Sequence, residues 1–373
     1  MSGLYIHIPY CHSKCAYCDF YSMPRTDSMQ QYVDALLTEL DLRIVEVKDE
    51  ITTVYIGGGT PSILPIELLS KIVERVSNYV DLLGVEEFTI EANPEDVTPE
   101  WVDAIYQLGI RRVSMGIQSF NDDELKVINR RHTASTAFKA VETLQRGGIS
   151  CISGDLIYGL PKQDLASWKQ SLDALLSLHL PHFSAYLLSY EPGTGLYARL
   201  MSGKVEEASE ELANEMYQYL IEKSRSNGYN HYEISNFAQH GQEAIHNTNY
   251  WRDLPYLGIG VSAHSFDGKN RKFNPANVKE YIARLLQKKC YYEVEEEDAT
   301  SRHNDYIIVA LRTAQGIDLI KYKEQFGVDA YDNLMKIATN HIKDGRMVFA
   351  KSHLAINEQY MLISDRIMID FII

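Results

Sequence analysis

The sequence predicts an α/β fold, in which parallel strands joined by helices form a large domain followed by a smaller helical one. Over roughly the first 190 residues, short β-type runs alternate six times with amphipathic helical segments. Parallel neighbouring strands need crossover connections of that length. Beyond this point the alternation breaks down and the pattern becomes mostly helical. Six such units form either an open barrel or a doubly wound sheet, and in both the loops after the strands carry the functional site.

The six predicted strands are short runs of β-type residues. They are Leu4–Ile8, Val54–Ile56, Glu87–Ile90, Arg112–Gly116, Ile152–Ile157 and Phe183–Leu188. Between them, apolar residues recur at helical spacing, which predicts amphipathic helices. The predicted helices are Met29–Val47, Ile66–Val80, Trp101–Leu108, Ser135–Arg146 and Trp168–His179.

A different organisation is predicted for the second half of the chain. A long helix over Ser209–Asn227 leads into an irregular stretch, Gly228–Asp267, and a helix over Val278–Lys289 precedes the acidic linker Glu293–Asp298. From about Ser301 the pattern reads three helices and then two short strands, which resembles a small winged-helix unit. We therefore predict a core over residues 1–228, a connecting region over 229–298 and a C-terminal domain over 299–373.

Composition narrows the class of protein. With 373 residues, of which 45% are hydrophobic, the chain can bury a large core. The formal net charge of −15 opposes broad nucleic-acid binding, which needs a cationic face, so no nucleic-acid partner is expected. No secretory leader pattern opens the chain, and no run reaches the ~18 apolar residues of a membrane span. We therefore expect a cytoplasmic protein, in which Cys151 and Cys290 are buried free thiols rather than disulfide partners.

Three clustered cysteines follow the first predicted strand. Cys11, Cys15 and Cys18 have the spacing C-x3-C-x2-C, which is typical of a metal site. They are one short of the four sulfurs that a closed zinc or ferredoxin site uses. An iron of a cubane cluster that lacks a protein ligand can bind a small molecule. A zinc site completed by His7 or His12 is the alternative.

Glycine and polar residues follow the other strands. The run Gly57–Pro61, of sequence GGGTP, follows the second strand, and its three glycines let the backbone approach a ligand closely. It is not a P-loop, because the GxxxxGK[ST] spacing is missing. Acid, amide and guanidinium groups on one rim suit a ligand with an amine, a carboxylate and ribose hydroxyls. Each residue alone could instead be a solvated strand end, a helix cap or a surface charge. These candidates are Glu91, Gln118, Arg130 and Asp155.

The cysteine spacing, the GGGTP run and the sixfold alternation together resemble the radical S-adenosylmethionine superfamily. This resemblance implies a partial (β/α)6 barrel, similar to a TIM barrel. It also implies that Cys11, Cys15 and Cys18 hold a [4Fe–4S] cluster whose fourth iron is chelated by S-adenosylmethionine. A low-potential cluster of this kind passes an electron to the sulfonium and releases a 5′-deoxyadenosyl radical.

Within the superfamily, the chain resembles the oxygen-independent coproporphyrinogen III oxidase group over nearly its whole length. The segments that carry this resemblance are Tyr5–Cys11, Arg112–Phe120, Asn129-Arg130 and Asp155–Pro161. The residues implied to contact the cluster-bound S-adenosylmethionine are Tyr5, Gly58 and Glu91, with Tyr17 along the adenine. The positions that line a second nucleoside site in the oxidase are matched by Gly59, Thr60, Gln118, Arg130 and Asp155.

Two features point instead to a sister group, the haem chaperones of the HemW type. The oxidase has a further cysteine two residues after the third ligand, whereas this chain has Phe20. In addition, His246–Trp251 reads HNTNYW and matches the HNxxYW signature associated with haem binding in that group. The resemblance implies that His246 ligates haem iron, beside the flat apolar surfaces of Tyr250 and Trp251. Taken alone, a single histidine in an aromatic stretch is more often a satisfied core residue.

The sequence therefore predicts a haem chaperone that binds haem and transfers it to acceptor haemoproteins, on a scaffold that holds a [4Fe–4S] cluster and S-adenosylmethionine. The first alternative is oxidative decarboxylation of coproporphyrinogen III in porphyrin biosynthesis, and the second is a radical enzyme with another substrate. The family suggests membrane-bound respiratory acceptors, which would imply peripheral membrane contact, although no polybasic or strongly amphipathic anchor stands out. A monomer and a homodimer both remain open.

Overall fold

A single twelve-stranded sheet forms the centre of the computed structural model, which describes residues 1–24, 26–296 and 298–373. Six parallel strands lie side by side in the order in which they occur along the chain. A doubly wound sheet would reverse that order at a switch point, so the strands form an open barrel. The predicted α/β fold is confirmed. These strands are β1 (Ser2–Ile8), β2 (Ile51–Gly58), β3 (Glu87–Ala92), β4 (Arg112–Gln118), β5 (Cys151–Tyr158) and β6 (His182–Leu187).

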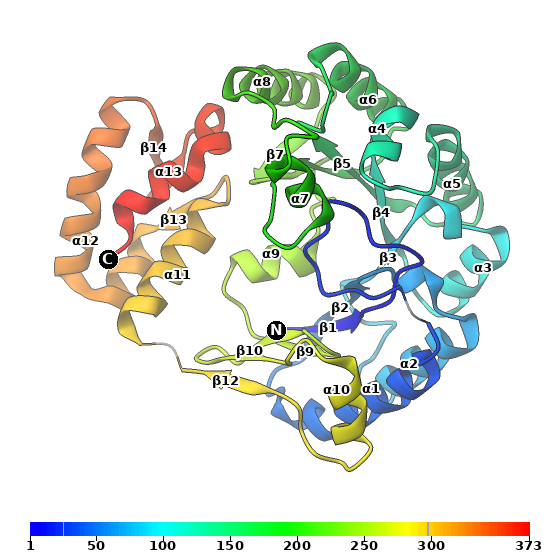
Figure 1. Cartoon of the computed structure of the whole chain (residues 1–373). Coiled ribbons are helices and arrows are strands. Elements are labelled where there is room, and N and C mark those ends of the chain that lie inside the picture. The colour runs from blue at the N-terminus through cyan, green and yellow to red at the C-terminus, as the bar shows by residue number, and fades with distance from the viewer. Residues whose placement is uncertain (25, 297) are drawn as a thin grey trace.

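Helices form an arc around the outside of the barrel (Figure 1). Side chains alternate between the two faces of a strand, and in β1 the helix-facing set is fully buried and apolar: Leu4, Ile6 and Ile8. The inner faces of β4, β5 and β6 are polar, which leaves room for a site inside the barrel. The helices are α1 (Met29–Arg43), α2 (Ile66–Ser77), α3 (Pro99–Gln107), α4 (Asp122–Val127), α5 (Ala134–Arg146), α6 (Leu165–Ser177), α7 (Gly195–Met201) and α8 (Glu210–Ser226).

The stretch predicted to be irregular, residues 228–267, is instead regular and extends the sheet at both edges. Strand β9 pairs parallel with β1, and β8 pairs antiparallel with β6. The strands here are only three or four residues long and carry polar and aromatic residues, so they lack an apolar run that predicts a strand. The elements are β7 (Asn230–Glu233), β8 (Asn236–Ala238), α9 (Ile245–Trp251), β9 (Tyr256–Ile259) and β10 (His264–Phe266).

Beyond β10 the sheet continues through two further antiparallel strands to its edge. The predicted acidic linker starts as the last of these strands, and its residue 297 lies outside the described residues. The boundaries of the three predicted parts stay a prediction. The elements are β11 (Arg271–Phe273), α10 (Val278–Leu285) and β12 (Glu293–Glu295).

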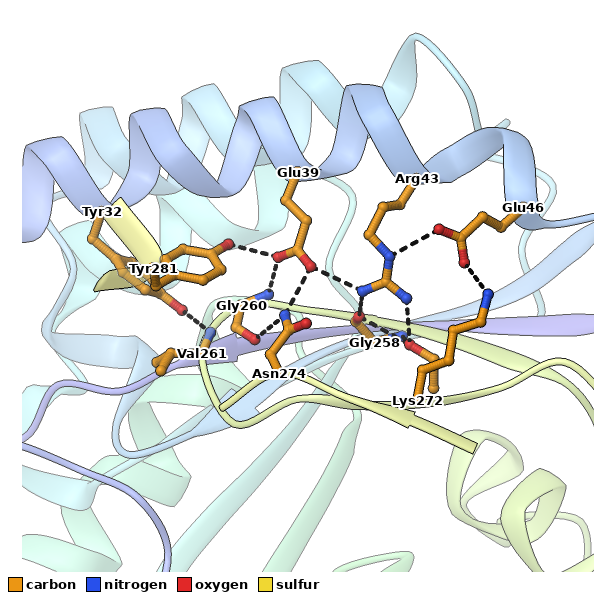
Figure 2. Close-up of polar contacts among 11 residues, drawn as sticks. Tyr32, Glu39, Arg43, Glu46, Gly258, Gly260, Val261, Lys272, Asn274 and Tyr281 are labelled. Atoms are coloured by element: carbon orange, nitrogen blue, oxygen red, sulfur yellow. Dashed lines mark hydrogen bonds and ion pairs between the residues drawn. The ribbon is translucent and has the colours of Figure 1, made fainter. Parts of the chain in front are cut away.

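A buried polar network fastens the β9–β10 region to α1 (Figure 2). Glu39 accepts hydrogen bonds from the Gly260 N–H at 2.7 Å and from the Tyr281 hydroxyl at 2.6 Å. Arg43 donates to Glu39 at 2.9 Å and to the Gly258 carbonyl at 3.1 Å. Because Glu39 and Arg43 are almost fully buried, each charge depends on the other and on these hydrogen bonds.

The C-terminal part follows the order helix, strand, helix, helix, strand, strand, which is the order of a winged helix. Its long helix is interrupted at Gly327, where φ is 90°. The structure adds one strand to the two predicted, and the three form their own sheet. Of the residues that the structure describes, none forms a helix both long and apolar enough to cross a membrane. The elements are α11 (Ala299–Leu311), β13 (Ile317–Asp318), α12 (Leu319–Lys343), β14 (Met347–Ala350), β15 (His353–Ile356) and α13 (Ser364–Met368).

Candidate functional site

A cavity of about 430 Å³ opens inside the barrel at the carboxyl ends of the strands, and we call it the cysteine cavity. It brings together nearly all the site residues predicted from the sequence. Tyr5 and His246 are the exceptions and do not line it. The predicted residues that do are Cys11, Cys15, Tyr17, Cys18, Gly58, Gly59, Thr60, Glu91, Gln118, Arg130 and Asp155.

The three thiols lie on one wall of this cavity. The Cys11 sulfur accepts a hydrogen bond from the Thr60 hydroxyl at 3.3 Å, and the Cys15 sulfur accepts one from Arg130 at 3.5 Å. Burial raises the pKa of Cys18 to about 11 and also raises the pKa of Cys11. Both are therefore thiols at neutral pH until a metal displaces the proton.

The glycine run places backbone against the thiols where no side chain would fit. Gly58 has φ of +115°, and a Cβ there would lie 2.7 Å from the His7 ring. At Gly59 a Cβ would lie 3.0 Å from the Cys11 sulfur. The Gly58 N–H donates to Glu91 at 3.0 Å. The run thus forms a close-fitting cradle beside the cysteines, which requires glycine for both conformation and space.

Two carboxyl groups lie deep in the cavity. Burial raises the pKa of Glu91 to about 7, although its side chain accepts a hydrogen bond from the Tyr55 hydroxyl at 2.7 Å. Burial likewise raises the pKa of Asp155 to about 6, and Ser184 donates to it at 2.8 Å. A ligand that carries a positive charge would stabilise both carboxylates, because it would offset the loss of hydration that burial causes.

Arg130 lies on the wall of the cysteine cavity that carries the thiols. It donates to the Asn93 side chain at 2.6 Å and to the Gly116 carbonyl. Its Nε has no partner among the described residues although the atom is buried. A buried donor without a partner costs free energy, so this atom marks a place that a ligand can occupy. Gln118, close by, adopts φ of 67°, which is unusual for a residue with a side chain.

This arrangement fits a [4Fe–4S] cluster better than a zinc ion. In the described parts of the chain, no group of three or more His, Cys, Asp or Glu side chains is arranged to hold a single metal ion. The His7 ring is already hydrogen-bonded to Tyr5 at 3.0 Å and to the Tyr21 carbonyl at 3.2 Å. A cubane places each thiolate on a different iron, so its ligands need not converge on one point. The three thiols line one cavity beside the glycine cradle without converging on a single point, which suits such a group.

His246 lies outside the cysteine cavity, on α9 at the opposite end of β1 and β2. Only 1% of it is exposed, and it stacks on Tyr55. One ring nitrogen bonds the Thr53 hydroxyl and the other the Tyr250 hydroxyl, each at 2.8 Å. Burial lowers the pKa of His246 to about 3. The imidazole is neutral, as an iron ligand must be, but both nitrogens are engaged in this conformation.

A second cavity, of about 510 Å³, lies beside the first, and we call it the aromatic cavity. Tyr5 lines it, as do Tyr250 and Trp251 of the HNTNYW run. Asp19 and Phe20 line both cavities, and Phe20 is 65% exposed. The loop that carries the cysteines therefore forms a shared wall between the two cavities.

The sequence did not reveal several residues of the cysteine cavity. They include Tyr55, Asn93, Arg112, Ser114, His182 and Ser184. A signal was present, because polar residues recur at every second position in β4, β5 and β6, as expected for side chains that face the barrel interior. Without the register of the strands, that alternation does not show which carboxylate each serine meets.

Comparisons with known proteins agree with these motifs. A profile of the Radical SAM superfamily matches residues 5–175. The chain is 34% identical over 331 residues to the Heme chaperone HemW of Bacillus subtilis, covering 88% of this chain and 87% of that protein. It is 35% identical over 327 residues to the Heme chaperone HemW of Lactococcus lactis, covering 87% and 85% respectively.

Among solved structures, the coproporphyrinogen III oxidase HemN of Escherichia coli, described as a radical SAM enzyme, superposes with a TM-score of 0.85. The superposition covers 99% of this chain and 89% of the oxidase, at 22% sequence identity. At that identity the likeness concerns the fold alone.

Proposed function

The chain belongs to the radical SAM superfamily and, within it, to the family of the heme chaperone HemW, and we propose that it binds haem and delivers it to acceptor haemoproteins. The observation that carries the proposal is the similarity to two proteins named heme chaperones over nearly nine-tenths of the chain. The HNTNYW helix and the neighbouring aromatic cavity support it, because a porphyrin needs flat apolar walls.

The proposed cofactors are a [4Fe–4S] cluster on Cys11, Cys15 and Cys18, and S-adenosylmethionine on its fourth iron. When bound, they supply a low-potential electron and a cleavable sulfonium. The residues proposed to bind the two nucleoside groups remain those predicted from the sequence. For the first they are Tyr5, Tyr17, Gly58 and Glu91, and for the second they are Gly59, Thr60, Gln118, Arg130 and Asp155.

His246 remains the proposed haem ligand from the HNTNYW run, on one structural condition. Its Nε2 is covered by the hydroxyl of Tyr250, and Tyr250 lines the aromatic cavity. Movement of Tyr250 would open the ring nitrogen toward that cavity. Membrane-bound respiratory acceptors, peripheral membrane contact, a homodimer and a cytoplasmic location remain predictions from the resemblance and the composition.

Haemin titration followed by transfer tests the proposal. We expect saturable binding of one haem per chain, seen as a Soret band. We also expect that haem to move into an apo-haemoprotein, which is then separated from the chain by its affinity tag and assayed for haem. His246→Ala should weaken haemin binding at least about tenfold, which corresponds to about 1.4 kcal/mol, because it removes the proposed axial ligand. Unsaturable haemin uptake, or a loaded chain that never releases haem to the acceptor, would contradict the chaperone function.

The alternative, coproporphyrinogen III decarboxylation, has a separate readout. The reconstituted chain is incubated anaerobically with coproporphyrinogen III, S-adenosylmethionine and a reductant. Protoporphyrinogen formed together with 5′-deoxyadenosine would favour the oxidase over the chaperone. Cleavage of S-adenosylmethionine without turnover of the porphyrinogen would favour a radical enzyme with another substrate.

A further inference from the structure

Two histidines, His7 and His264, line the aromatic cavity, and a third, His246, lies behind Tyr250. The three differ in whether a ring nitrogen is available. Both ring nitrogens of His7 are hydrogen-bonded, and so are both of His246. His264, at the start of β10, lines the cavity and is exposed to it. Its ring makes no hydrogen bond with the residues that the structure describes and packs 5.9 Å from the ring of Phe273. A metal ion can therefore reach His264 without breaking an existing bond.

The other walls of the cavity suit a flat apolar ligand. They include Phe20, Tyr250, Trp251, Tyr256 and Phe266. A volume of about 510 Å³ is in the usual range of ligand and cofactor sites. The indole N–H of Trp251 is buried and has no partner among the described residues, which leaves a donor for a polar group of a ligand.

The position of His264 is fixed by its neighbours. The hydroxyl of Ser265, the next residue, accepts hydrogen bonds from the Gly258 N–H at 2.9 Å and from Arg43 at 3.1 Å. These bonds belong to the network that fastens β9 and β10 to α1 (Figure 2). A ligand held on a rigid element loses little conformational entropy when it binds its metal.

The imidazole of His264 is also in the protonation state that binds iron. Burial and the nearby Arg271 lower the pKa of His264 below its ordinary value, while Glu295 opposes them. The ring is therefore neutral at pH 7, and a neutral imidazole nitrogen is the form that ligates a metal.

We propose that His264 is an axial ligand of haem iron bound in the aromatic cavity, with the porphyrin between Phe20 and the Tyr250–Trp251 end of α9. This inference rests on the proposed haem binding and adds a ligand outside the HNTNYW run. In the present conformation His264 is the available ligand, and His246 becomes available only after Tyr250 moves. Because Phe20 and Asp19 also line the cysteine cavity, the haem would lie next to the loop that carries the cysteines.

Haemin titration of the full chain and three variants tests this ligand. We expect His264→Ala to shift the Soret maximum and to weaken haemin binding at least tenfold. Imidazole added to the His264→Ala complex should restore the parental spectrum, because it replaces the missing ligand in an intact cavity. His240→Ala is the matched control, since this histidine is exposed and does not line the cavity. Phe20→Ala should weaken binding without changing the ligand type.

The possible outcomes distinguish a wrong ligand assignment from a wrong function. A parental Soret position and affinity in His264→Ala would overturn the assignment. Loss of binding that imidazole cannot restore would also count against it, because that result indicates a structural role. If the unmodified chain fails to bind haemin saturably, the proposed function itself fails, independently of His264.

Discussion

Burial of Glu91 and Asp155 is the most consequential feature of the site at the scale of single residues. Each carboxyl is hydrogen-bonded, yet the pKa of each is raised because the charged form has lost water. Because burial destabilises the two carboxylates, a cationic ligand that binds beside them stabilises their charged forms. That property matches a sulfonium and an ammonium group, which S-adenosylmethionine carries.

Glu91→Gln should stabilise the cluster-free protein above neutral pH. The pKa of Glu91 is about 7 in the folded chain, against 4.5 for an ordinary glutamate. Between these values the folded state holds more protons than the unfolded state, so stability falls as pH rises. The amide can accept from the Gly58 N–H and donate to the Tyr55 oxygen. At pH 8 we expect a gain of up to about 3 kcal/mol in urea unfolding, which disappears near pH 4.

The control for this experiment is Glu95→Gln, which should behave in the opposite way. Burial alone would raise the pKa of Glu95, but the nearby His132, whose Nδ1 lies 3.5 Å from the carboxylate, lowers it below its ordinary value. Its carboxylate therefore stabilises the folded chain above about pH 4.5, and the variant should lose stability at neutral pH. A Glu91→Gln variant that is no more stable than its parent at pH 8 would show that the buried carboxylate carries no penalty.

At the residue scale, site residues that belong to a local motif could be predicted from the sequence, whereas site residues that only the fold brings together could not. Cys11, Cys15 and Cys18 were predictable because their ligand spacing is local. Asn93 joins Thr60 to Arg130 through hydrogen bonds between three separate segments, so no local pattern could reveal it. His264 is a lone histidine in sequence and becomes a candidate only because its neighbours in the cavity are known.

At the scale of elements, the loop between β1 and α1 is the part of the molecule that links the two cavities. It carries the three cysteines on one side and presents Phe20 to both cavities. Helix α9 lies at the other end of β1, and its residues Tyr250 and Trp251 line the aromatic cavity. Two short elements, far apart in sequence, thus supply the walls of one proposed haem site.

Replacement of all three loop cysteines by alanine should abolish the cluster and leave the fold intact. After anaerobic reconstitution, the variant should lose the absorption near about 400 nm that iron–sulfur clusters show, along with bound iron and sulfide. Cys290→Ala is the control, because this cysteine lies far from the loop in sequence and does not line the cavity. The expectation that Cys290 is buried was wrong, since the structure exposes it, and Cys151 is only partly buried. Stoichiometric iron and sulfide in the triple variant would contradict the assignment of the ligands.

The elements that the sequence predicted best are those of the repeating βα pattern, because β-type runs that alternate regularly with amphipathic helices carry a strong periodic signal. The short edge strands β7 to β10 were missed for the opposite reason. Strands β9 and β8 pair with β1 and β6, which are distant in sequence, and β10 and β7 pair in turn with β9 and β8. Their conformation is therefore set by tertiary contacts rather than by local propensity.

At the scale of the whole molecule, the buried pair of Glu39 and Arg43 joins the barrel to the segment that carries His264. The network reaches from α1 to Gly258, Gly260 and Tyr281 (Figure 2). An isolated charge in such a position is costly, whereas a paired one with satisfied hydrogen bonds is tolerated. The network could not be predicted from the sequence, because the residues of α1 are more than 200 residues away from their partners Gly258, Gly260 and Tyr281.

Arg43→Met should destabilise the chain by about 3–5 kcal/mol in urea unfolding, because it leaves the Glu39 carboxylate buried without its counter-charge. Glu39→Gln combined with Arg43→Met should recover part of that loss. Lys126→Met is the matched control, since it breaks an exposed pair with Asp123 and should leave the free energy of unfolding nearly unchanged. An Arg43→Met variant as stable as the Lys126→Met variant would mean that the network does not hold the two segments together.

The central claim is that this radical SAM protein binds and delivers haem rather than making a haem precursor. The most direct measurement exposes one anaerobically reconstituted preparation in parallel to haemin, and to coproporphyrinogen III with S-adenosylmethionine and a reductant. We predict saturable binding of one haem per chain in the first sample and no protoporphyrinogen in the second. Protoporphyrinogen in the second sample, with no saturable haem binding in the first, would contradict the account.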